Sequence, residues 1–268
     1  MPPTSPSYPR TVIDQLGRAV QLPHPPRRLV SLVPSQTELL VDLGLSAQLV
    51  GATKFCTHPA AVRRTASLVG GTKNFDFTQI DALRPDLILG NKEENYLAGI
   101  EQLARSYPVW VSEVADLPGA LDMIRRVGDL TGTLPAATAL AAEVAGAFGQ
   151  LSRPASLTPA AYFIWRKPYM VAAGSTFIDD MLRRAGFANV FAHLGRYPEI
   201  TPAQLAAAAP AHILLSSEPY PFQAKHVVEF QAICPAAAVQ VVDGELFSWY
   251  GSRLRHSASY FRTLAPLA

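Results

Sequence analysis

The sequence is poor in cysteine and in concentrated positive charge. Only two cysteines occur, Cys56 and Cys234, and the arginine pairs are scattered along the chain. Two isolated cysteines do not form a disulfide framework and indicate little about redox compartment. The net charge is only +2, whereas nucleic-acid binding requires a concentrated basic face. We therefore expect neither a structural disulfide nor a nucleic-acid partner.

Long apolar runs are also missing. No run of about 18 apolar residues exists, so the sequence predicts no transmembrane helix. The opening MPPTSPSYPR lacks the apolar core that a secretory signal needs, and the four prolines in residues 1–9 predict a flexible lead-in. If this N-terminus is native, we expect a cytoplasmic protein. A leader that had been trimmed would leave the compartment open.

The composition instead favours a large folded core. Apolar residues make up 49% of the chain and charged residues 16%, which excludes a disordered chain. The 268 residues are enough for one large domain or two lobes of ordinary size.

One folding plan occurs twice in the sequence. Each copy has a helix closed by glycine, a short helix stopped by proline, an apolar strand and a further strand. The recurring pieces are PSQTELLVDLGL from Pro34, IDALRPDLIL from Ile80 and PVWVSEV from Pro108, then GSTFIDDMLRRAGF from Gly174, LAAAAPAHILL from Leu205 and AAVQVVDGE from Ala237. The second copy begins more than 100 residues after the first, and this long offset indicates a duplicated lobe and not a short repeat. We expect a small ligand in the cleft between two lobes.

Strands that alternate with helices predict an α/β fold with largely parallel sheets. The segment Leu134–Leu151 is alanine-rich and carries Pro135 in a first-turn position, so it predicts a single helix of about 27 Å. The expected parts are an N-terminal lead with a β-hairpin (1–26), an N-terminal lobe (27–133), a connecting helix (134–152) and a C-terminal lobe (153–268).

Two helix starts are predicted in more detail. Ser35 or Pro34 opens the first helix, with Glu38 in the position of a capping box. In the second lobe, the charged residues of DDMLRR, starting at Asp179, are interpreted as a solvated helix face without chemistry.

The order of these pieces resembles a known family. The carrying stretches are TVIDQLGRAVQLP, RRLVSLVPSQTELLVDLGL, GGTKNFDFTQIDALRPDLILGNKEEN, YMVAAGSTFIDDMLRRAGFANVF and DGELFSWYGSR. They are similar to class III substrate-binding proteins of ABC importers, most of all to the vitamin B12-binding branch. The resemblance implies two Rossmann-like lobes joined by one rigid helix. It also implies a non-enzymatic, monomeric receptor that needs no cofactor and captures a metal chelate such as cobalamin. The location would be periplasmic or at the cell surface, with an importer permease as partner.

Aromatic residues on loops after strands are the first candidate ligand contacts. At positions matching Tyr169 and Tyr197, the B12-binding relatives hold aromatics that pack on the corrin. Aromatic faces suit a wide, flat macrocycle. Glu245 falls near a ligand-contacting aspartate of the relatives. Trp249 and Tyr250 are adjacent, so only one of them can face the core of a regular element, and we expect the other to face the cleft.

The first lobe supplies two further loops. Phe55, Cys56 and His58 in FCTHP are expected to form a cleft wall, with His58 as a candidate axial ligand to the metal. Cys56 is a soft ligand, but one cysteine and one histidine do not make a closed metal site.

GGTKNF forms the second loop, where two glycines let backbone approach a ligand. Thr72 stands where relatives hold a corrin-stacking tryptophan, and Lys73 and Asn74 are expected to contact amide or acidic groups. Glu93 and Glu94 in the next strand-end loop are interpreted as a solvated helix start.

Other roles are left open. Arg253 is expected to anchor its loop or pair with a carboxylate, and Glu218 lies either against Lys225 or His226 or in the cleft. The relatives carry one docking glutamate on each lobe, but this chain has Thr78 and Ala203 there, with Glu199 nearby.

Three alternatives remain. Within the same class, the ligand would be haem or an iron–siderophore. From another class, a cytosolic tetrapyrrole–metal chelatase would use His58, His193 and Glu218 as metal ligands and proton acceptors. A cytosolic sensor or carrier without a permease is the third. No nucleophile triad, P-loop or GxGxxG motif demands an enzyme.

Overall fold

The computed structural model describes residues 7–152 and 154–264. The predicted lead-in of residues 1–9 therefore lies mostly outside the described residues. The chain divides into two compact units. Unit 1 holds the residues through Val114, then Pro118–Val144 and Tyr250–Arg253. Unit 2 holds Ala115–Leu117, Ala145–Trp249 and the residues from Leu254 onward.

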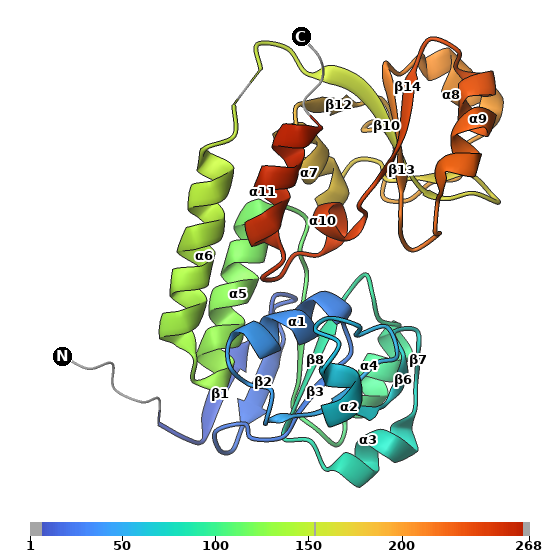
Figure 1. Cartoon of the computed structure of the whole chain (residues 1–268). Helices are drawn as coiled ribbons and strands as arrows, with labels where there is room; N and C mark the ends of the chain where they lie inside the picture. Colours follow the sequence, from blue (N-terminus) through green and yellow to red (C-terminus); the bar gives the residue numbers. More distant parts are fainter. Residues whose placement is uncertain (1–6, 153, 265–268) are drawn as a thin grey trace. The chain divides into compact units, whose positions relative to one another are not determined.

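Unit 1 is built on a parallel sheet (Figure 1). In spatial order its strands are β5 (Ser67–Leu68), β4 (Leu49–Ala52), β3 (Leu29–Ser31), β8 (Leu87–Asn91) and β9 (Val109–Ser112). Parallel neighbours need crossover connections. The unit's short helices supply most of them: α1 (Pro34–Asp42), α2 (Val62–Thr65), α3 (Phe77–Leu83) and α4 (Leu97–Ala104). Apolar residues of β3, β8 and β9 form one buried cluster with α3 and α4.

Two hairpins complete unit 1. The expected N-terminal hairpin is present as β1 (Arg10–Ile13) and β2 (Ala19–Leu22). A second hairpin joins β6 (Gly70–Gly71) to β7 (Asn74–Phe75). The second hairpin occupies the GGTKNF segment, so this segment turns back on itself before α3 begins.

Unit 2 has a mixed sheet. Its order is β11 (Met170–Val171), β10 (Thr158–Trp165), β13 (His212–Ser216) and β14 (Ala238–Val242), with β12 (Phe187–Asn189) also paired to β10. All pairs are parallel except β10 with β11. The helices are α7 (Phe177–Arg184), α8 (Pro202–Ala208), α9 (Ala224–Ile233), α10 (Glu245–Ser248) and α11 (Leu254–Thr263). The α/β class predicted from the sequence is confirmed.

The recurring sequence pieces adopt the same local structure. The helices α3 and α8 both end at a residue in the left-handed region, Arg84 (φ 46°) and Ala209 (φ 43°). Pro85 and Pro210 follow them, and β8 and β13 come next. Proline cannot continue a helix, so both pieces turn from helix into a central strand at the same position.

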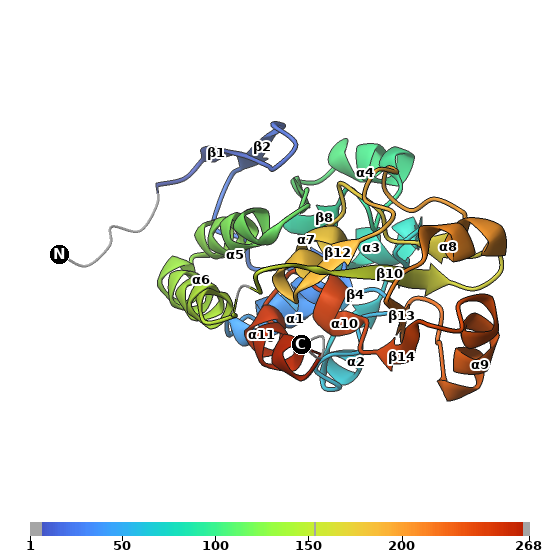
Figure 2. The same cartoon turned by 90° about the horizontal axis from the view of Figure 1, so that it is seen from above.

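The long helices are α5 (Leu117–Thr131) and α6 (Leu134–Gly149). The helix expected from Leu134 begins there and is 16 residues long, and it passes from unit 1 to unit 2 after Val144. Within unit 1 the two helices run side by side in both views (Figures 1 and 2). A Cβ at Gly128 would lie 2.3 Å from the Cβ of Ala137, so glycine is what permits this close approach.

The predicted capping box of α1 is wrong. Val33 is the N-cap and makes no side-chain cap bond, while Pro34 occupies the first turn. Glu38 instead accepts hydrogen bonds from Nε and Nη2 of Arg253, at 2.9 and 2.7 Å. Arg253 therefore pairs with a carboxylate, which is one of the two roles predicted for it.

The predicted solvated face of α7 is wrong for its two aspartates, although Arg183 on the same face is exposed. Asp179 and Asp180 are each only 8% exposed. Asp180 accepts from the backbone N–H of Leu117 at 2.9 Å and pairs with Arg184 at 2.7 Å. Asp179 accepts from the Asn189 amide at 2.9 Å. These carboxylates join α7 to its neighbours, and sequence periodicity carries no signal for such long-range partners.

Candidate ligand-binding site

The loops after β4 and β8 lie at the same edge of the unit 1 sheet, because the carboxyl ends of parallel strands meet there. The loop after β4 contacts the β6–β7 hairpin, since the N–H of Lys54 donates to Gly70 O at 2.9 Å. Gly71 brings the hairpin backbone under Phe55: a Cβ there would lie 3.4 Å from Cε2 of that ring and 2.5 Å from Oδ1 of Asn74. Phe55 remains 51% exposed.

The hairpin is tied in turn to the loop after β8. The amide of Asn95 donates to Thr72 O at 3.0 Å, and Nζ of Lys73 donates to Glu93 O at 2.6 Å. The structure thus brings four predicted contacts, Phe55, Thr72, Lys73 and Asn74, to one edge. Lys73 and Asn74 are exposed and Thr72 is half-buried.

A buried polar layer supports these loops. Ser112 at the end of β9 accepts from the amides of Gln36, at 2.6 Å, and Asn91, at 2.9 Å. Oδ1 of Asn91 accepts from the N–H groups of Glu93 and Glu94 at 2.8 and 3.1 Å. This layer was not predicted from the sequence. A signal was present, because the apolar strands LILGN and VWVS both end in a polar residue.

The fold buries Cys56, whereas the predicted ligand contact requires an accessible side chain. Its side chain is 1% exposed, and its sulfur accepts from the Thr37 hydroxyl at 3.0 Å and lies 3.3 Å from that of Thr53. Burial raises the pKa of the thiol, so it stays protonated and unreactive. His58 lies two residues further on and is half-buried. Within residues 7–152 and 154–264, no group of three or more His, Cys, Asp or Glu side chains could hold a metal ion.

Glu94 is not part of a solvated helix start, contrary to the prediction. The helix α4 begins only at Leu97, and Glu94 is half-buried in the loop before it. Burial raises the pKa of its carboxyl, with Lys73 acting in the opposite direction. Glu94 is thus a carboxylate partly withdrawn from water at the edge of the sheet.

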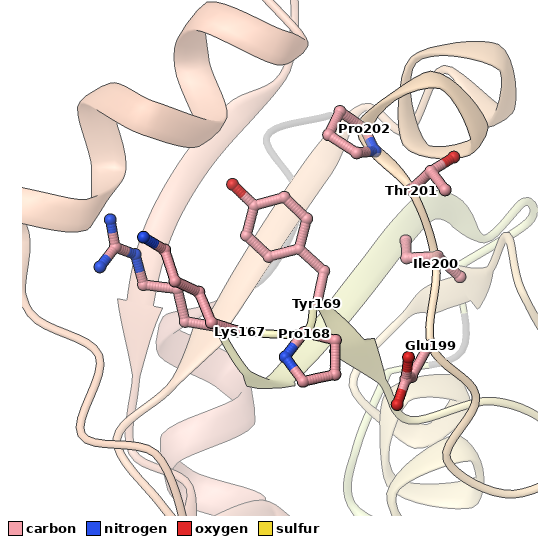
Figure 3. A pocket seen from close by; sticks show the side chains of 8 residues that line it. Lys167, Pro168, Tyr169, Glu199, Ile200, Thr201 and Pro202 are labelled. Carbon is pink, nitrogen blue, oxygen red and sulfur yellow. The ribbon is translucent and has the colours of Figure 1, made fainter.

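Unit 2 has a groove of about 420 Å³ at the carboxyl end of β10. The Tyr169 ring lies between the Lys167–Pro168 turn and the segment 199–202 (Figure 3). Carbon-rich walls come from Pro168, Ile200 and Pro202, and charges come from Lys167 and Glu199 on its rim.

Tyr169 is held firmly in this groove. Its hydroxyl donates to the carboxylate of Glu229 on α9, and its ring packs on those of Phe163 and Phe230, at centroid distances of 6.0 and 5.2 Å. Burial and the bond to Glu229 raise the pKa of Tyr169 to about 12. Burial alone would raise the pKa of Glu229, but hydrogen bonds from Arg166, at 2.8 Å, and from Tyr169 lower it overall.

Sequence reasoning missed Trp165, the last residue of β10. It is 39% exposed. Its indole N–H donates to Lys167 O at 3.1 Å, and its ring meets Tyr220 edge-on at 5.6 Å. The sequence signal that could have predicted it is an aromatic residue directly before the charged turn Arg166–Lys167.

The remaining candidate residues of the second half differ in how deeply they are buried. Trp249 and Tyr250 are both buried, at 7% and 5% exposure, so the expectation that one of them is exposed is wrong. The indole of Trp249 donates to Oε1 of Glu218 at 2.8 Å. Oε1 of Glu218 also accepts from the Ser248 hydroxyl, at 2.7 Å. Tyr197 and Glu245 are half-buried, in a loop and at the start of α10.

The positions expected for permease docking are exposed. Thr78 lies in the first turn of α3 and Ala203 in the first turn of α8. Carboxylates lie close in sequence to both: Asp76 caps α3 by accepting from the N–H of Gln79 at 3.0 Å, and Glu199 lies on the rim of the groove before α8.

Two α/β units, each with parallel strands and loops gathered at their carboxyl ends, define a class of small-molecule-binding folds. Residues 29–232, more than half of the chain, match the family model of the periplasmic binding proteins, and the chain belongs to that family. None of the described helices is long and apolar enough to cross a membrane.

Two curated relatives carry names that refer to cobalamin. The chain is 28% identical over 204 residues to a cobalamin-binding protein of Halobacterium salinarum, a match that covers 73% of this chain and 55% of that protein. It is 26% identical over 196 residues to a vitamin B12-binding protein of Photorhabdus laumondii, which covers 71% of each. The chain thus spans only about half the length of the first relative.

Solved structures share the fold. The periplasmic vitamin B12-binding protein of Vibrio cholerae superposes with a TM-score of 0.76 at 19% identity, over 89% of this chain and 96% of that one. The periplasmic haem-binding protein of Vibrio cholerae gives a TM-score of 0.76 at 21% identity, over 89% of this chain and 99% of that one. At these identities the likeness concerns the fold alone.

Proposed function

We propose that this chain is a binding protein for a cobalamin-like corrinoid or another metal chelate. The observation that carries the proposal is the set of aromatic side chains at the carboxyl ends of the sheets: Phe55 in unit 1, and Trp165 and Tyr169 in unit 2. The names of the curated relatives support the same ligand class.

Stacking is the physical basis of the proposed binding. Flat, partly apolar macrocycles bury large area against aromatic faces. Phe55 is 51% exposed, and Nζ of Lys54 lies 5.2 Å from its ring centroid. Contact with a ligand would remove this exposed aromatic area from water, which is favourable.

We further propose that binding involves no bond chemistry and no cofactor of the protein's own. The thiol of Cys56 is buried with a raised pKa, and the Tyr169 hydroxyl is engaged by Glu229. The nucleophile-bearing residues described near the strand ends are therefore held in place by the fold and are not poised for reaction.

The proposed partner is an importer permease, with the chain acting as a monomer in the periplasm or at the cell surface. Docking would involve the exposed first turns of α3 and α8, where Thr78 and Ala203 carry no charge. Asp76 and Glu199 would then supply the negative charge near those turns.

Haem is the second candidate ligand. The exposed lysines Lys54 and Lys73 at the unit 1 edge would favour a chelate with carboxylates. A haem-binding protein is also among the solved structures with this fold.

Equilibrium dialysis of the full chain against cyanocobalamin, hemin and a ferric hydroxamate separates these ligands. We expect retention of cyanocobalamin, and at least tenfold weaker retention by Phe55→Ala and Trp165→Ala. Val228→Ala is the matched control, because Val228 is 73% exposed on α9 and is not one of the residues that line the groove. Retention of hemin alone would favour the second candidate, and retention of none of the three would contradict the proposal.

A further inference from the structure

Glu229 on α9 bonds to two of the residues that line the groove of unit 2. Its Oε2 accepts from Nε of Arg166 at 2.8 Å and lies 2.7 Å from Nη2 of the same guanidinium. Its Oε1 accepts from the Tyr169 hydroxyl. Arg166 and Tyr169 line the groove, whereas Glu229 is not among the lining residues. Glu229 therefore acts on the groove through two side chains that a ligand there would meet.

The carboxylate of Glu229 is ionised. Both of its oxygens accept hydrogen bonds, and one donor is a guanidinium, which bonds most strongly to a charged carboxylate. Burial raises the pKa of Glu229, but the hydrogen bonds from Arg166 and Tyr169 outweigh it and lower that pKa overall. Glu229 therefore cancels the charge of Arg166 at neutral pH.

The bond to Glu229 also fixes the ring of Tyr169. The ring packs on Phe163 and Phe230, at centroid distances of 6.0 and 5.2 Å, and the hydroxyl at its far end is held by the carboxylate. A rotation of the side chain would break these contacts together. The ring is thus held in the groove (Figure 3) before a ligand arrives, and such preorganisation reduces the ordering cost of binding.

The charges at the groove balance. Arg166 and Lys167 contribute two positive charges, and Glu199 and Glu229 contribute two negative charges, so their sum is zero. The other lining residues are uncharged: Pro168, Tyr169, Ile200, Thr201 and Pro202. A ligand carboxylate would lose hydration in this groove without gaining a free counter-charge from Arg166. Without Glu229 the sum would become positive, and Arg166 could pair with such a carboxylate.

We infer that Glu229 is a specificity-determining residue of unit 2. By neutralising Arg166 and holding the Tyr169 ring in place, it fits the groove to a flat, uncharged part of a chelate and against a part that carries carboxylates. The inference rests on the proposed function and goes beyond it, because it assigns this choice to a positioning residue that does not itself line the groove.

Isothermal titration calorimetry of the full chain tests this with cyanocobalamin, hemin and the monocarboxylic acid derivatives of cyanocobalamin, in each of which one amide is hydrolysed. The readout is the ratio of the affinity for cyanocobalamin to that for each monocarboxylate. A general loss of structure weakens both ligands and leaves this ratio unchanged.

The ratio should respond in opposite directions to the two halves of the ion pair. Glu229→Gln frees Arg166, so for at least one monocarboxylate the ratio should fall about threefold, the strength of a partly exposed ion pair. Arg166→Gln leaves an excess of negative charge, so the ratio should rise. The double variant Arg166→Gln/Glu229→Gln restores the balance and should return the ratio to its original value.

Glu101→Gln is the control, because it makes the same change in net charge at an exposed position on α4 of unit 1. Its ratio should match that of the unsubstituted chain.

The hold on Tyr169 is tested without a ligand. A glutamine carries no charge and accepts a weaker bond, so Glu229→Gln should lower the pKa of Tyr169. In an absorbance titration, the tyrosinate lost on adding Tyr169→Phe should be larger at about pH 11 in the Glu229→Gln background than in the unsubstituted chain. An equal loss in both backgrounds would overturn the inference, whichever ligand binds.

The remaining outcomes separate the inference from the proposed function. If cyanocobalamin binds but the ratio is unchanged for every monocarboxylate, or moves in the same direction in both single variants, the inference alone fails. Binding of hemin without either corrinoid would overturn the inference and favour the second candidate ligand. Binding of none of the probes would contradict the proposed function and the inference with it.

Discussion

Single side chains explain why a late segment of the chain belongs to unit 1. The segment Tyr250–Arg253 joins that unit, because Arg253 forms two bonds to Glu38 across 215 positions of sequence. Gly251 also lies close to α1, where a Cβ would stand 2.5 Å from Ser35 O. A carboxylate partner for Arg253 could be predicted from the sequence. Its identity could not, because nothing local links the two residues.

Removing this ion pair should destabilise unit 1. The side chains of Arg253 and Glu38 are 15% and 16% exposed, so Glu38→Gln would leave a largely buried guanidinium without its counter-charge. We expect a loss of about 2–3 kcal/mol in the free energy of unfolding, measured by urea denaturation. Glu101→Gln, at an exposed position, should change it by less than about 0.5 kcal/mol. Equal effects of the two substitutions would contradict the account.

The titration of Tyr169 is a second prediction at this scale. Its folded pKa of about 12 lies above the unfolded value of about 10. The stability it contributes is therefore complete below about pH 10 and is lost as the pH rises toward 12. In an absorbance titration of tyrosinate between about pH 9 and pH 11, Tyr169→Phe should show the same gain as the unsubstituted chain. A loss of one tyrosine's amplitude in this range would show that Tyr169 ionises normally.

At the level of helices and strands, local patterns predicted most of the architecture. The hairpin at Thr11, the strand–helix alternation and the start of the long helix at Leu134 all follow from periodicity and from proline and glycine positions. The failures concern helix ends and faces. Pro34 begins α1 without a side-chain cap, and the charges of α7 are buried by partners far away in sequence. Propensity and spacing report local geometry but not which remote group will satisfy a polar side chain.

The contact of α5 with α6 makes a prediction for these elements. Gly128→Ala would place a Cβ 2.3 Å from that of Ala137 and 3.2 Å from Cα of Leu134. Overpacking of this kind destabilises by about 1–3 kcal/mol. Gly146→Ala, in α6 and with nothing within 4 Å of its new Cβ, should stabilise by about 0.5–1 kcal/mol. Denaturant unfolding of both variants measures the difference, and a shift of the same sign in both would contradict the packing argument.

For the whole molecule, the duplicated plan correctly predicted two α/β units. That the loops at the strand ends face a ligand stays a prediction. The candidate site was predicted only in part. Phe55 follows the parallel strand β4, and the β6–β7 hairpin that carries Thr72, Lys73 and Asn74 is bonded to the loops after β4 and β8, so the four residues gather at one edge. Glu94 was assigned to a solvated helix start and Trp165 was overlooked, because exposure and desolvation depend on how the surrounding loops fold, which no local pattern encodes. Cys56 and Trp249 show the opposite error: the sequence predicted them as ligand contacts because one is reactive and the other aromatic, but the fold buries both.

The central claim is that this chain is a receptor for a cobalamin-like metal chelate, and calorimetric titration of the full chain with cyanocobalamin tests it most directly. The account predicts one ligand per chain at micromolar affinity or tighter. Phe55→Ala, Trp165→Ala and Tyr169→Ala should weaken that affinity, while Val228→Ala leaves it unchanged. Absence of heat at saturating ligand, or binding that none of the three aromatic substitutions alters, would contradict the claim.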